Sequence, residues 1–278
     1  MKKLILSLPI ILALAAVYLF WGNNSLTVGK YSVSPKNLPE SFDGFRIVQV
    51  SDLHNKDFHG RLIKKIGSLA PDVIVITGDI IDSYQTKSEV ALDFAEKALK
   101  IAPVYYITGN HESRIEIYPQ FRKSLENIGV EVLDCRGVTL EKDGSEIFLA
   151  GMDDLTFFGS SVLNEETAEF LEKLDELAAE KGGRTGILLS HRPEIFDVYA
   201  QSGFNLVFTG HAHGGQIRLP FVGGVLTPNQ GFFPQYDSGL FEKENTSMII
   251  SRGLGNSLFP FRIGNRPEIV VCDLVTEK

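Results

Sequence analysis

Residues 45–54 read FRIVQVSDLH, an apolar run that ends in two side chains able to bind a metal, Asp52 and His54. A mainly apolar run of this kind indicates a strand buried on both faces. Four further apolar runs end in the same way, and ligands of α/β sheets bind outside the carboxyl ends of strands, so these side chains are expected to converge. The four endings are Ile76-Thr77-Gly78-Asp79, Ile107-Thr108-Gly109-Asn110-His111, Leu189-Ser190-His191 and Phe208-Thr209-Gly210-His211-Ala212-His213.

Strand-like runs alternate with helical patterns along the chain, which predicts an α/β fold with parallel pairing among the early strands. The later part is richer in strands. No tandem repeat or second domain boundary interrupts the pattern. The predicted strands are Phe45–Val50, Val73–Ile76, Val104–Ile107, Ile147–Leu149, Gly186–Leu189, Leu206–Phe208, Met248–Ile250 and Ile269–Val271, and the predicted helices are Arg61–Leu69, Ser88–Lys100 and Asn164–Lys181.

Two pairs of candidate ligands are spaced so that each pair can hold one centre. Asp52 and His54 are two residues apart, as are His211 and His213, and such residues point to the same side of an extended chain. A glycine directly precedes Asp79, Asn110 and His211 in the sequence. Glycine permits a sharp turn of the backbone that aims the next side chain inward. Imidazole and carboxylate ligands without a thiolate suit Mn, Fe or Zn.

In order, the segments DxH, GD, GNHE, H and GHxH resemble the motifs of the calcineurin-like metallophosphoesterases, from about Gly44 to the C-terminus. Within this stretch, GHAHGGQ at residues 210–216 and SRGLGN at residues 251–256 resemble the membrane-anchored bacterial subgroup. The resemblance implies two packed mixed β-sheets flanked by helices, an α/β/β/α sandwich. It also implies a hydrolase that depends on two divalent metal ions.

The resemblance assigns a role to each matching position. The site would hold two divalent ions, of Mn, Zn, Fe or a mixture. Their positive charge exceeds the negative charge of the two Asp carboxylates, so the site would attract a phosphate group. Such a pair of ions can clamp the attacking and leaving oxygens of an in-line displacement. His111 would be the catalytic residue that protonates the leaving oxygen or stabilises phosphoryl charge, and Glu112 is a candidate for orienting it. The implied ligands are Asp52, His54 and His213 for one metal, Asn110, His191 and His211 for the other, and Asp79 as the bridge.

The N-terminus predicts a transmembrane signal-anchor over residues 1–22. Lys2 and Lys3 precede an uncharged apolar run of 18 residues, 4–21, against the ~20 that span a bilayer, with Tyr18 and Trp21 as interfacial anchors. A cleaved signal peptide, with Ala13-Leu14-Ala15 as its site, and a buried helix are the alternatives. Residues 23–43 are expected to form a tether, and residues 44–278 a domain outside the cytoplasm.

Composition limits the partners. The 278 residues carry a formal net charge of -8, which argues against a nucleic-acid-binding surface.

Cys135 and Cys272 lack zinc-binding spacing and are expected to be buried and unreactive, with a disulfide as the alternative. His59 is expected to be a solvent-facing loop residue. Residues 221–241, with Phe232, Phe233 and Tyr236, are expected to be a structured loop that forms a pocket wall, lies against lipid or packs locally.

Other polar residues near the motif are open in role. Asp153 and Asp154 are interpreted as loop or helix-cap residues. Arg192, Arg252 and Asn256 are candidates for touching substrate phosphate or bracing the ligands, although surface ion pairs are equally expected for the arginines.

These observations predict a phosphodiesterase, phosphatase or pyrophosphatase at the outer face of the cytoplasmic membrane, where a lipid-linked substrate would suit the anchor. The alternative is a non-catalytic metal-binding or interaction module on the same fold. A nuclease would use the same chemistry but needs a basic groove, which the acidic balance disfavours.

Overall fold

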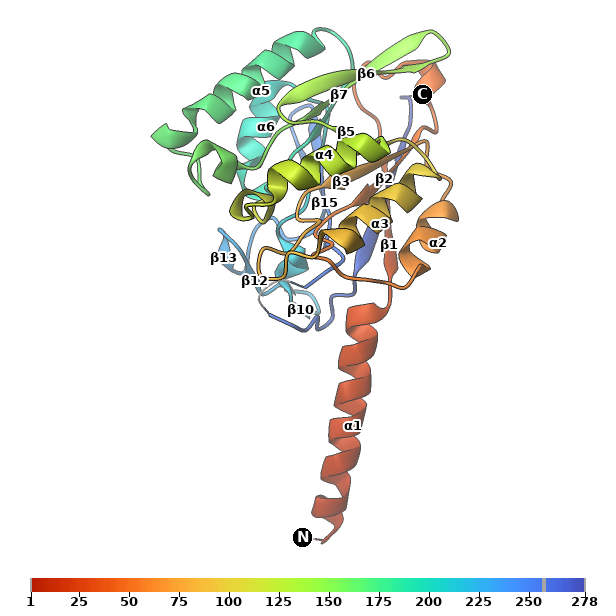
Figure 1. The fold of residues 1–278 in the computed structure, drawn as a ribbon, viewed down its shortest axis with the longest axis vertical. Coiled ribbons are helices and arrows are strands. Elements are labelled where there is room, and N and C mark those ends of the chain that lie inside the picture. The colour runs from red at the N-terminus through yellow and green to blue at the C-terminus, as the bar shows by residue number, and fades with distance from the viewer. Residues whose placement is uncertain (1, 257–258, 278) are drawn as a thin grey trace.

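The computed structural model describes residues 2–256 and 259–277, with side chains from residue 9 onward. A globular body carries a single helix, α1 (Lys2–Asn24), that projects from it (Figure 1). The body contains two six-stranded sheets and two short strand pairs.

The first sheet carries three of the predicted strand ends on its parallel part. Strands β2, β3, β4 and β5 run parallel to one another, β16 is antiparallel to β2, and β1 is parallel to β16. The order across the sheet is β1 (Thr27–Val33), β16 (Glu268–Leu274), β2 (Arg46–Val50), β3 (Val73–Thr77), β4 (Val104–Ile107) and β5 (Glu131–Val132).

The second sheet carries the other two strand ends. Its four central strands run parallel, and an antiparallel strand closes each edge. The order across the sheet is β14 (Gly239–Lys243), β15 (Thr246–Ile250), β9 (Leu206–Thr209), β8 (Gly186–Leu189), β7 (Ser145–Gly151) and β6 (Arg136–Lys142).

Alternation along each strand separates the apolar side chains into three buried clusters, because successive residues of a strand point to opposite faces. Ile47 and Val75 of the first sheet lie in the same cluster as Leu189 and Phe208 of the second, which places this cluster between the sheets. The two remaining clusters lie on the outer faces, beneath helices. The predicted α/β/β/α sandwich of mixed sheets is therefore confirmed.

Helices cover the two outer faces (Figure 1). Ile66, Ala95 and Leu125 belong to helices packed on the first sheet, and Leu174 and Tyr199 to helices packed on the second. The helices on the first sheet are α2 (Arg61–Gly67), α3 (Ser88–Leu99) and α4 (Tyr118–Ile128), and those on the second are α5 (Ala168–Lys181) and α6 (Phe196–Ser202).

Short helices and strands connect the larger elements, and several of them follow the polar strand ends. The predicted structured loop, residues 221–241, holds strand residues of both short pairs and so is ordered by backbone hydrogen bonds. The short elements are the 3₁₀ helices η1 (Glu40–Phe42), η2 (Glu112–Arg114), η3 (Leu155–Phe158), η4 (Glu165–Thr167), η5 (Pro193–Ile195) and η6 (His213–Gly215), and the strands β10 (Arg218–Leu219), β11 (Gly223–Gly224), β12 (Leu226–Thr227) and β13 (Gly231–Phe232).

Each of the eight predicted strands and three predicted helices has a counterpart in the structure. The helix predicted over Asn164–Lys181 is divided into η4 and α5. The prediction of an irregular tether over residues 23–43 is wrong for part of that stretch. Its residues 27–33 form β1, which pairs with β16 along seven residue pairs, from Thr27 opposite Glu268 to Val33 opposite Leu274. The polar composition of this stretch is that of an edge strand, which needs only one buried face.

The N-terminal segment also departs from expectation. Met1 and the side chains of residues 2–8 lie outside the described part, so the span predicted over residues 1–22 falls partly beyond it. Among the helices of the described residues, none has the length and apolar character needed to cross a membrane. The structure therefore does not support the predicted transmembrane helix.

Tyr18 and Trp21, which were predicted to be interfacial anchors, contact the domain. The Tyr18 hydroxyl accepts a hydrogen bond from the backbone N–H of Gly264 at 3.1 Å. The guanidinium of Arg266 lies 4.6 Å from the centre of the Trp21 ring, a cation–π arrangement. The last turns of α1 are thus joined to the loop that leads into β16.

Candidate metal centre

Five strand ends bring the eight predicted site residues to one buried region. Because β2, β3 and β4 are parallel in one sheet and β8 and β9 in the other, their carboxyl ends meet where the two sheets adjoin. Each of the eight side chains is buried, and none is more than 7% exposed. They are Asp52 and His54 after β2, Asp79 after β3, Asn110 and His111 after β4, His191 after β8, and His211 and His213 after β9.

Seven of these residues are candidates for holding metal, and six of them form two groups with the geometry for it. Asp52, His54, Asp79 and His213 each offer a donor atom, and these atoms lie within 4.8 Å of one another. Asp79, His191 and His211 meet the same condition. Asp79 alone belongs to both groups among the described residues, as the predicted bridge requires.

The two oxygens of Asp79 have separate surroundings. Its Oδ1 accepts a hydrogen bond from the backbone N–H of His111 at 2.8 Å, which fixes the carboxylate. Its Oδ2 lies 3.7 Å from His54 Nε2 and 3.3 Å from His191 Nε2. One oxygen is therefore positioned and the other lies between an imidazole of each group.

His191 has a ring orientation that suits a ligand. Its Nδ1 lies 2.7 Å from the carbonyl oxygen of Thr77, which can only accept, so Nδ1 carries the proton. The buried Nε2 faces Asp79 Oδ2 at 3.3 Å. Burial opposes protonation of this ring, but the attraction of Asp79 raises the pKa of His191 to about 10, so the site favours a positive charge, carried by a proton or a metal ion, at Nε2. A hydrogen bond from the second nitrogen to a carbonyl oxygen is typical of metal-binding histidines.

Asn110 fits as an oxygen donor to the second group. Its Oδ1 is buried without a hydrogen-bond partner among the described residues, and an unsatisfied buried acceptor costs free energy unless something occupies it. Histidine nitrogens, carboxylate oxygens and an amide oxygen together suit Mn, Fe or Zn. The residues present therefore fit a pair of divalent ions.

Burial controls the protonation of the imidazoles and carboxylates. It lowers the pKa of His54 to about 4 and that of His213 well below its usual value, so both rings are neutral and free to bind metal. Burial, with repulsion from Asp79, raises the pKa of Asp52 to about 6. Burial opposes ionisation of Asp79 as well, but neighbouring imidazoles, His191 first among them, hold its pKa well below the usual value.

The backbone at the candidate ligands is held in an uncommon conformation. Asp52, His54, Asp79, His211 and His213 all have positive φ, between 46° and 63°. Non-glycine residues rarely adopt this left-handed region, and each costs free energy that the surrounding structure must offset. Such strain clusters at functional sites, where it aims side chains that regular strand geometry would direct elsewhere.

The glycines before the ligands serve two purposes. Gly78 has φ of 87°, so it makes the predicted sharp turn before Asp79. Gly109 and Gly210 instead leave space, because a Cβ at Gly109 would collide with Asp79 and one at Gly210 would collide with Asp52 and Ser51. Only the first of the three therefore uses the conformational freedom expected from the sequence.

His111 lies beside the metal ligands and is held by a residue that the sequence did not single out. The backbone N–H of Ser83 donates to His111 Nδ1 at 3.0 Å. A neutral ring that accepts at Nδ1 carries its proton on Nε2. The His111 ring also packs edge-on against His54, with ring centres 4.5 Å apart.

Glu112 does not orient His111, contrary to expectation. The fully buried Glu112 carboxylate accepts hydrogen bonds from backbone N–H groups of two loops, the one after β3 and the one after β4. It thereby joins the segments that present Asp79 and Asn110. The four donors are Asp79 at 2.9 Å, Ile80 at 2.9 Å, Ile81 at 3.2 Å and Gly109 at 2.7 Å.

A cavity of about 170 Å³ opens onto the site. Its lining includes Asp79 and His111, and Pro228 and Asn229 of the 221–241 loop, so that loop contributes a wall. Arg192 also lines it. Phe232 and Phe233 of the same loop are exposed, whereas Tyr236 packs against Phe196 and Phe241.

Arg192 is fixed by Asp154, which gives that acidic residue a role beyond the predicted cap. Arg192 Nε donates to Asp154 Oδ2 at 2.7 Å and Nη2 donates to Oδ1 at 3.0 Å, a buried two-point pair. Asp154 also caps η3 by accepting from the Thr156 N–H, as predicted. The neighbouring Asp153 accepts from Thr108 Oγ1 at 2.7 Å and does not line the cavity.

Two other candidates serve structure. Arg252 pairs with Glu268 at 2.8 Å, and Asn256 donates to the carbonyl oxygen of Pro260, so neither lines the cavity. Asn265, which the sequence did not single out, donates to the His213 carbonyl at 2.7 Å and supports that ligand. No local motif marks Ser83 or Asn265, because both act through contacts distant in sequence.

The remaining predictions concern isolated residues. His59 is exposed, as predicted, and lies 3.0 Å from Asp57. Both cysteines are free, and burial raises the pKa of each to about 12, so they are unreactive as predicted. Cys272 is buried as expected, whereas Cys135 is only partly buried.

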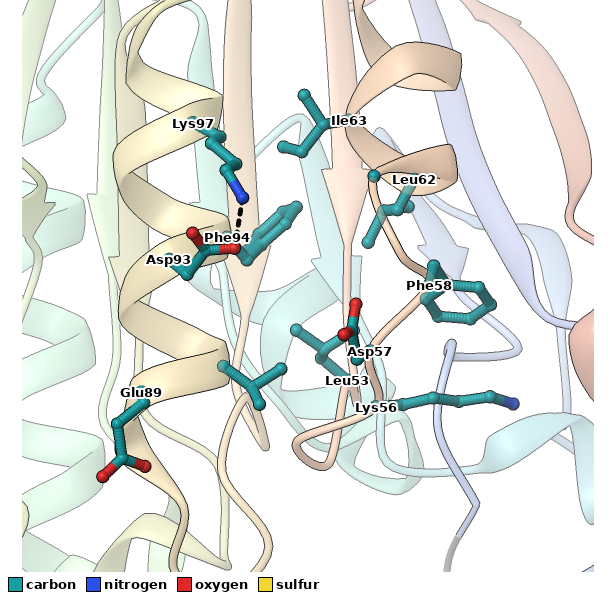
Figure 2. Close-up of a pocket in the computed structure, with 12 residues that line it drawn as sticks. Leu53, Lys56, Asp57, Phe58, Leu62, Ile63, Glu89, Asp93, Phe94 and Lys97 are labelled. Atoms are coloured by element: carbon teal, nitrogen blue, oxygen red, sulfur yellow. Dashed lines mark hydrogen bonds and ion pairs between the residues drawn. The ribbon is translucent and has the colours of Figure 1, made fainter.

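A second cavity, of about 220 Å³, lies between α2 and α3 (Figure 2). Leu53, Phe58, Leu62 and Phe94 give it an apolar wall, and Lys97 at its rim is paired with Asp93 at 2.6 Å. No histidine or cysteine lines it. Of the two cavities, only the smaller adjoins the candidate ligands.

Residues 45–215 match the calcineurin-like phosphoesterase family, and the chain belongs to that family. The match covers more than half of the chain and contains all eight site residues. The chain is therefore a metal-dependent phosphoesterase, and its two groups of ligand side chains support two divalent metal ions.

Named relatives share most of this chain. It is 32% identical over 253 residues to the metallophosphoesterase YkuE of Bacillus subtilis, covering 88% of this chain and 84% of the relative. It is 25% identical over 239 residues to the phosphodiesterase YaeI of Escherichia coli, covering 83% and 82%. The transmembrane protein with metallophosphoesterase domain of Bos taurus is 29% identical over 84% of this chain and 53% of its own.

Solved structures share the fold. The NAD nucleotidase of Haemophilus influenzae superposes with a TM-score of 0.51 at 15% identity, covering 76% of this chain and 45% of its own. The protein TT1561 of Thermus thermophilus superposes with a TM-score of 0.50 at 14% identity, covering 75% and 89%.

Proposed function

We propose that this chain hydrolyses phosphate esters by in-line attack of water on phosphorus, with Asp79 bridging two divalent ions and His111 assisting the leaving group. Asp52, His54 and His213 would hold one ion, and Asn110, His191 and His211 the other. When bound, the two ions supply positive charge that lowers the pKa of water and attracts the phosphoryl oxygens.

The observation that carries the proposal is the position of Asp79 Oδ2 between His54 Nε2 and His191 Nε2, at 3.7 and 3.3 Å. A single carboxylate oxygen shared by imidazoles of two ligand groups is the arrangement that places two cations close together. The Asp79 Oδ1 is already occupied by the His111 N–H. The segment that carries His111 therefore positions both the proposed bridging residue, Asp79, and the His111 side chain.

His111 is suited to donate a hydrogen bond from Nε2 to a phosphoryl oxygen or to the leaving oxygen. The Ser83 N–H occupies Nδ1, so the ring presents Nε2–H, and the side chain lines the cavity that adjoins the ligands. Stabilisation of developing negative charge by one such hydrogen-bond donor contributes about 10²- to 10³-fold to the rate. The small cavity accommodates a phosphoryl group while the ester group extends toward solvent.

The test is turnover of the full chain after chelation and separate reconstitution with Mn, Zn, Fe and Mg, over a panel of phosphomonoesters, phosphodiesters and diphosphates. We expect metal-dependent hydrolysis of at least one class. His111→Ala should lower kcat about 10²- to 10³-fold while metal content stays at the wild-type level. His59→Ala, which alters an exposed histidine, is the matched control.

Two outcomes would contradict this proposal. A metal-loaded chain that hydrolyses no member of the panel would favour the non-catalytic module on the same fold. Loss of bound metal in His111→Ala would make His111 a metal-holding residue and would contradict its role in stabilising charge on the reacting phosphoryl group.

A further inference from the structure

We propose that Arg114 binds a second phosphoryl group of the substrate, so that the site favours diphosphate-linked esters over esters with one phosphoryl group. This inference rests on the proposed function and concerns the substrate class of the same site. Arg114 ends η2, the short helix that directly follows His111.

The helix places Arg114 beside His111. The Arg114 N–H donates to the His111 carbonyl at 3.1 Å, an i to i+3 bond of the 3₁₀ type. In such a helix, side chains three residues apart lie one above the other on the same face. Both side chains accordingly line the cavity that adjoins the candidate metal ligands.

The position of η2 is fixed by its other two residues. Glu112 is tied to the backbone N–H groups of the Asp79 loop, and Ser113 Oγ lies 2.8 Å from Thr156 Oγ1 and donates to the Asn110 carbonyl. Arg114 therefore extends from a rigid base that is itself part of the ligand scaffold.

The guanidinium of Arg114 is exposed and has no hydrogen bond or ion pair with any described residue. Arg192, the other arginine of the cavity, differs because both oxygens of Asp154 and one of Glu194 already compensate its charge. Arg114 thus contributes an uncompensated positive charge at the cavity rim. A planar guanidinium with free N–H groups binds phosphate oxygens through two parallel hydrogen bonds.

The reaction that follows is cleavage of the diphosphate. The water oxygen forms a bond to the phosphorus over the metal ligands, and the bond from that phosphorus to the bridging oxygen breaks. The bridging oxygen stays with the second phosphoryl group, which Arg114 holds, and both products are phosphomonoesters. The protons of the water are released to solvent or to the leaving oxygen.

The experiment compares the methyl esters of adenosine 5′-phosphate and adenosine 5′-diphosphate as substrates of the full chain reconstituted with Mn²⁺. For Arg114→Met, the ratio of kcat/KM for the diphosphate to kcat/KM for the monophosphate diester should fall about 10- to 100-fold, the usual effect of a lost charged hydrogen bond. Arg114→Lys should lie between this variant and the wild type. Lys123→Met, at an exposed α4 residue, controls for net charge.

A second arm measures binding of methylenediphosphonate and methylphosphonate by calorimetry. The wild type should prefer the diphosphonate, and Arg114→Met should lose most of that preference. Equal ratios and equal preferences in wild type and Arg114→Met would overturn the inference. Failure of the wild type to hydrolyse either ester or any other member of the substrate panel would contradict the proposed function, and the binding arm would still decide the role of Arg114.

Discussion

The backbone N–H of Asp79 donates a hydrogen bond of 2.9 Å to Glu112 Oε2, across 33 positions of sequence. This contact joins the loop that carries the proposed bridging ligand to the loop that carries Asn110. Gly109, next to Asn110, donates to the same oxygen at 2.7 Å. The separation between the two metal-holding groups therefore depends on one buried carboxylate that would itself touch neither metal.

Glu112→Gln should weaken metal binding without removing a ligand. The amide has one acceptor oxygen, so its NH₂ group would face two of the four backbone N–H donors. Loss of such supporting contacts typically lowers metal affinity 10- to 100-fold. Titration calorimetry with Mn²⁺ measures this, and Glu116→Gln, at an exposed residue nearby, is the control. Wild-type affinity in Glu112→Gln would contradict the positioning role.

Asp154→Asn should destabilise the fold. It leaves the buried Arg192 guanidinium without its two-point partner, and breaking a buried pair costs about 3–5 kcal/mol. Asp197→Asn removes the exposed partner of Lys243 and should cost no more than about 1 kcal/mol. Urea unfolding of both variants provides the free energies of unfolding. Similar small losses for both would show that Arg192 finds other compensation.

Asp153 should make stability depend on pH. Burial, followed by repulsion from Asp134, raises its pKa to about 7, against about 4 in the unfolded chain. The folded chain therefore keeps a proton that the unfolded chain loses, and the free energy of unfolding contributed by Asp153 falls as pH rises from about 4 to about 7, at roughly 1.4 kcal/mol for each unit.

The measurement for Asp153 is urea unfolding across this window with EDTA present. The stability of wild type relative to Asp153→Asn should decline with rising pH and level off above about pH 7. Asp175→Asn, at an exposed position of α5, should show no such trend. A wild-type stability that tracks Asp153→Asn at every pH would refute the expected protonation.

Metal binding should stabilise the folded chain. A ligand at 100 times its Kd that binds only the folded state adds about 2.7 kcal/mol to the free energy of unfolding. Adding Mn²⁺ to the chelated chain should therefore raise its thermal midpoint, whereas Asp79→Asn, which loses the shared carboxylate, should respond much less. His59→Asn should respond as wild type does. An equal response of Asp79→Asn would exclude Asp79 as the bridge.

The central strands were predictable because burial on both faces leaves a nearly continuous apolar run, as in Val73 to Ile76 and Ile187 to Leu189. Edge strand β1 was not, since residues 27–33 face solvent on one side and their composition resembles that of a loop. Its pairing with β16 joins residues about 240 positions apart, and no local pattern records it. The same reasoning applies to the contacts of Tyr18 and Trp21.

By itself, the sequence determined an α/β fold and which side chains can bind metal, because these follow from the apolar period and from residue types at strand ends. The resemblance of its motifs to a known family implied the sandwich. Only the tertiary structure decided how the side chains are held. It assigned Ser83 to His111, Glu112 to the two ligand loops, and Asp154 to Arg192. These assignments depend on hydrogen-bond directions between distant segments, which the order of residues along the chain does not specify.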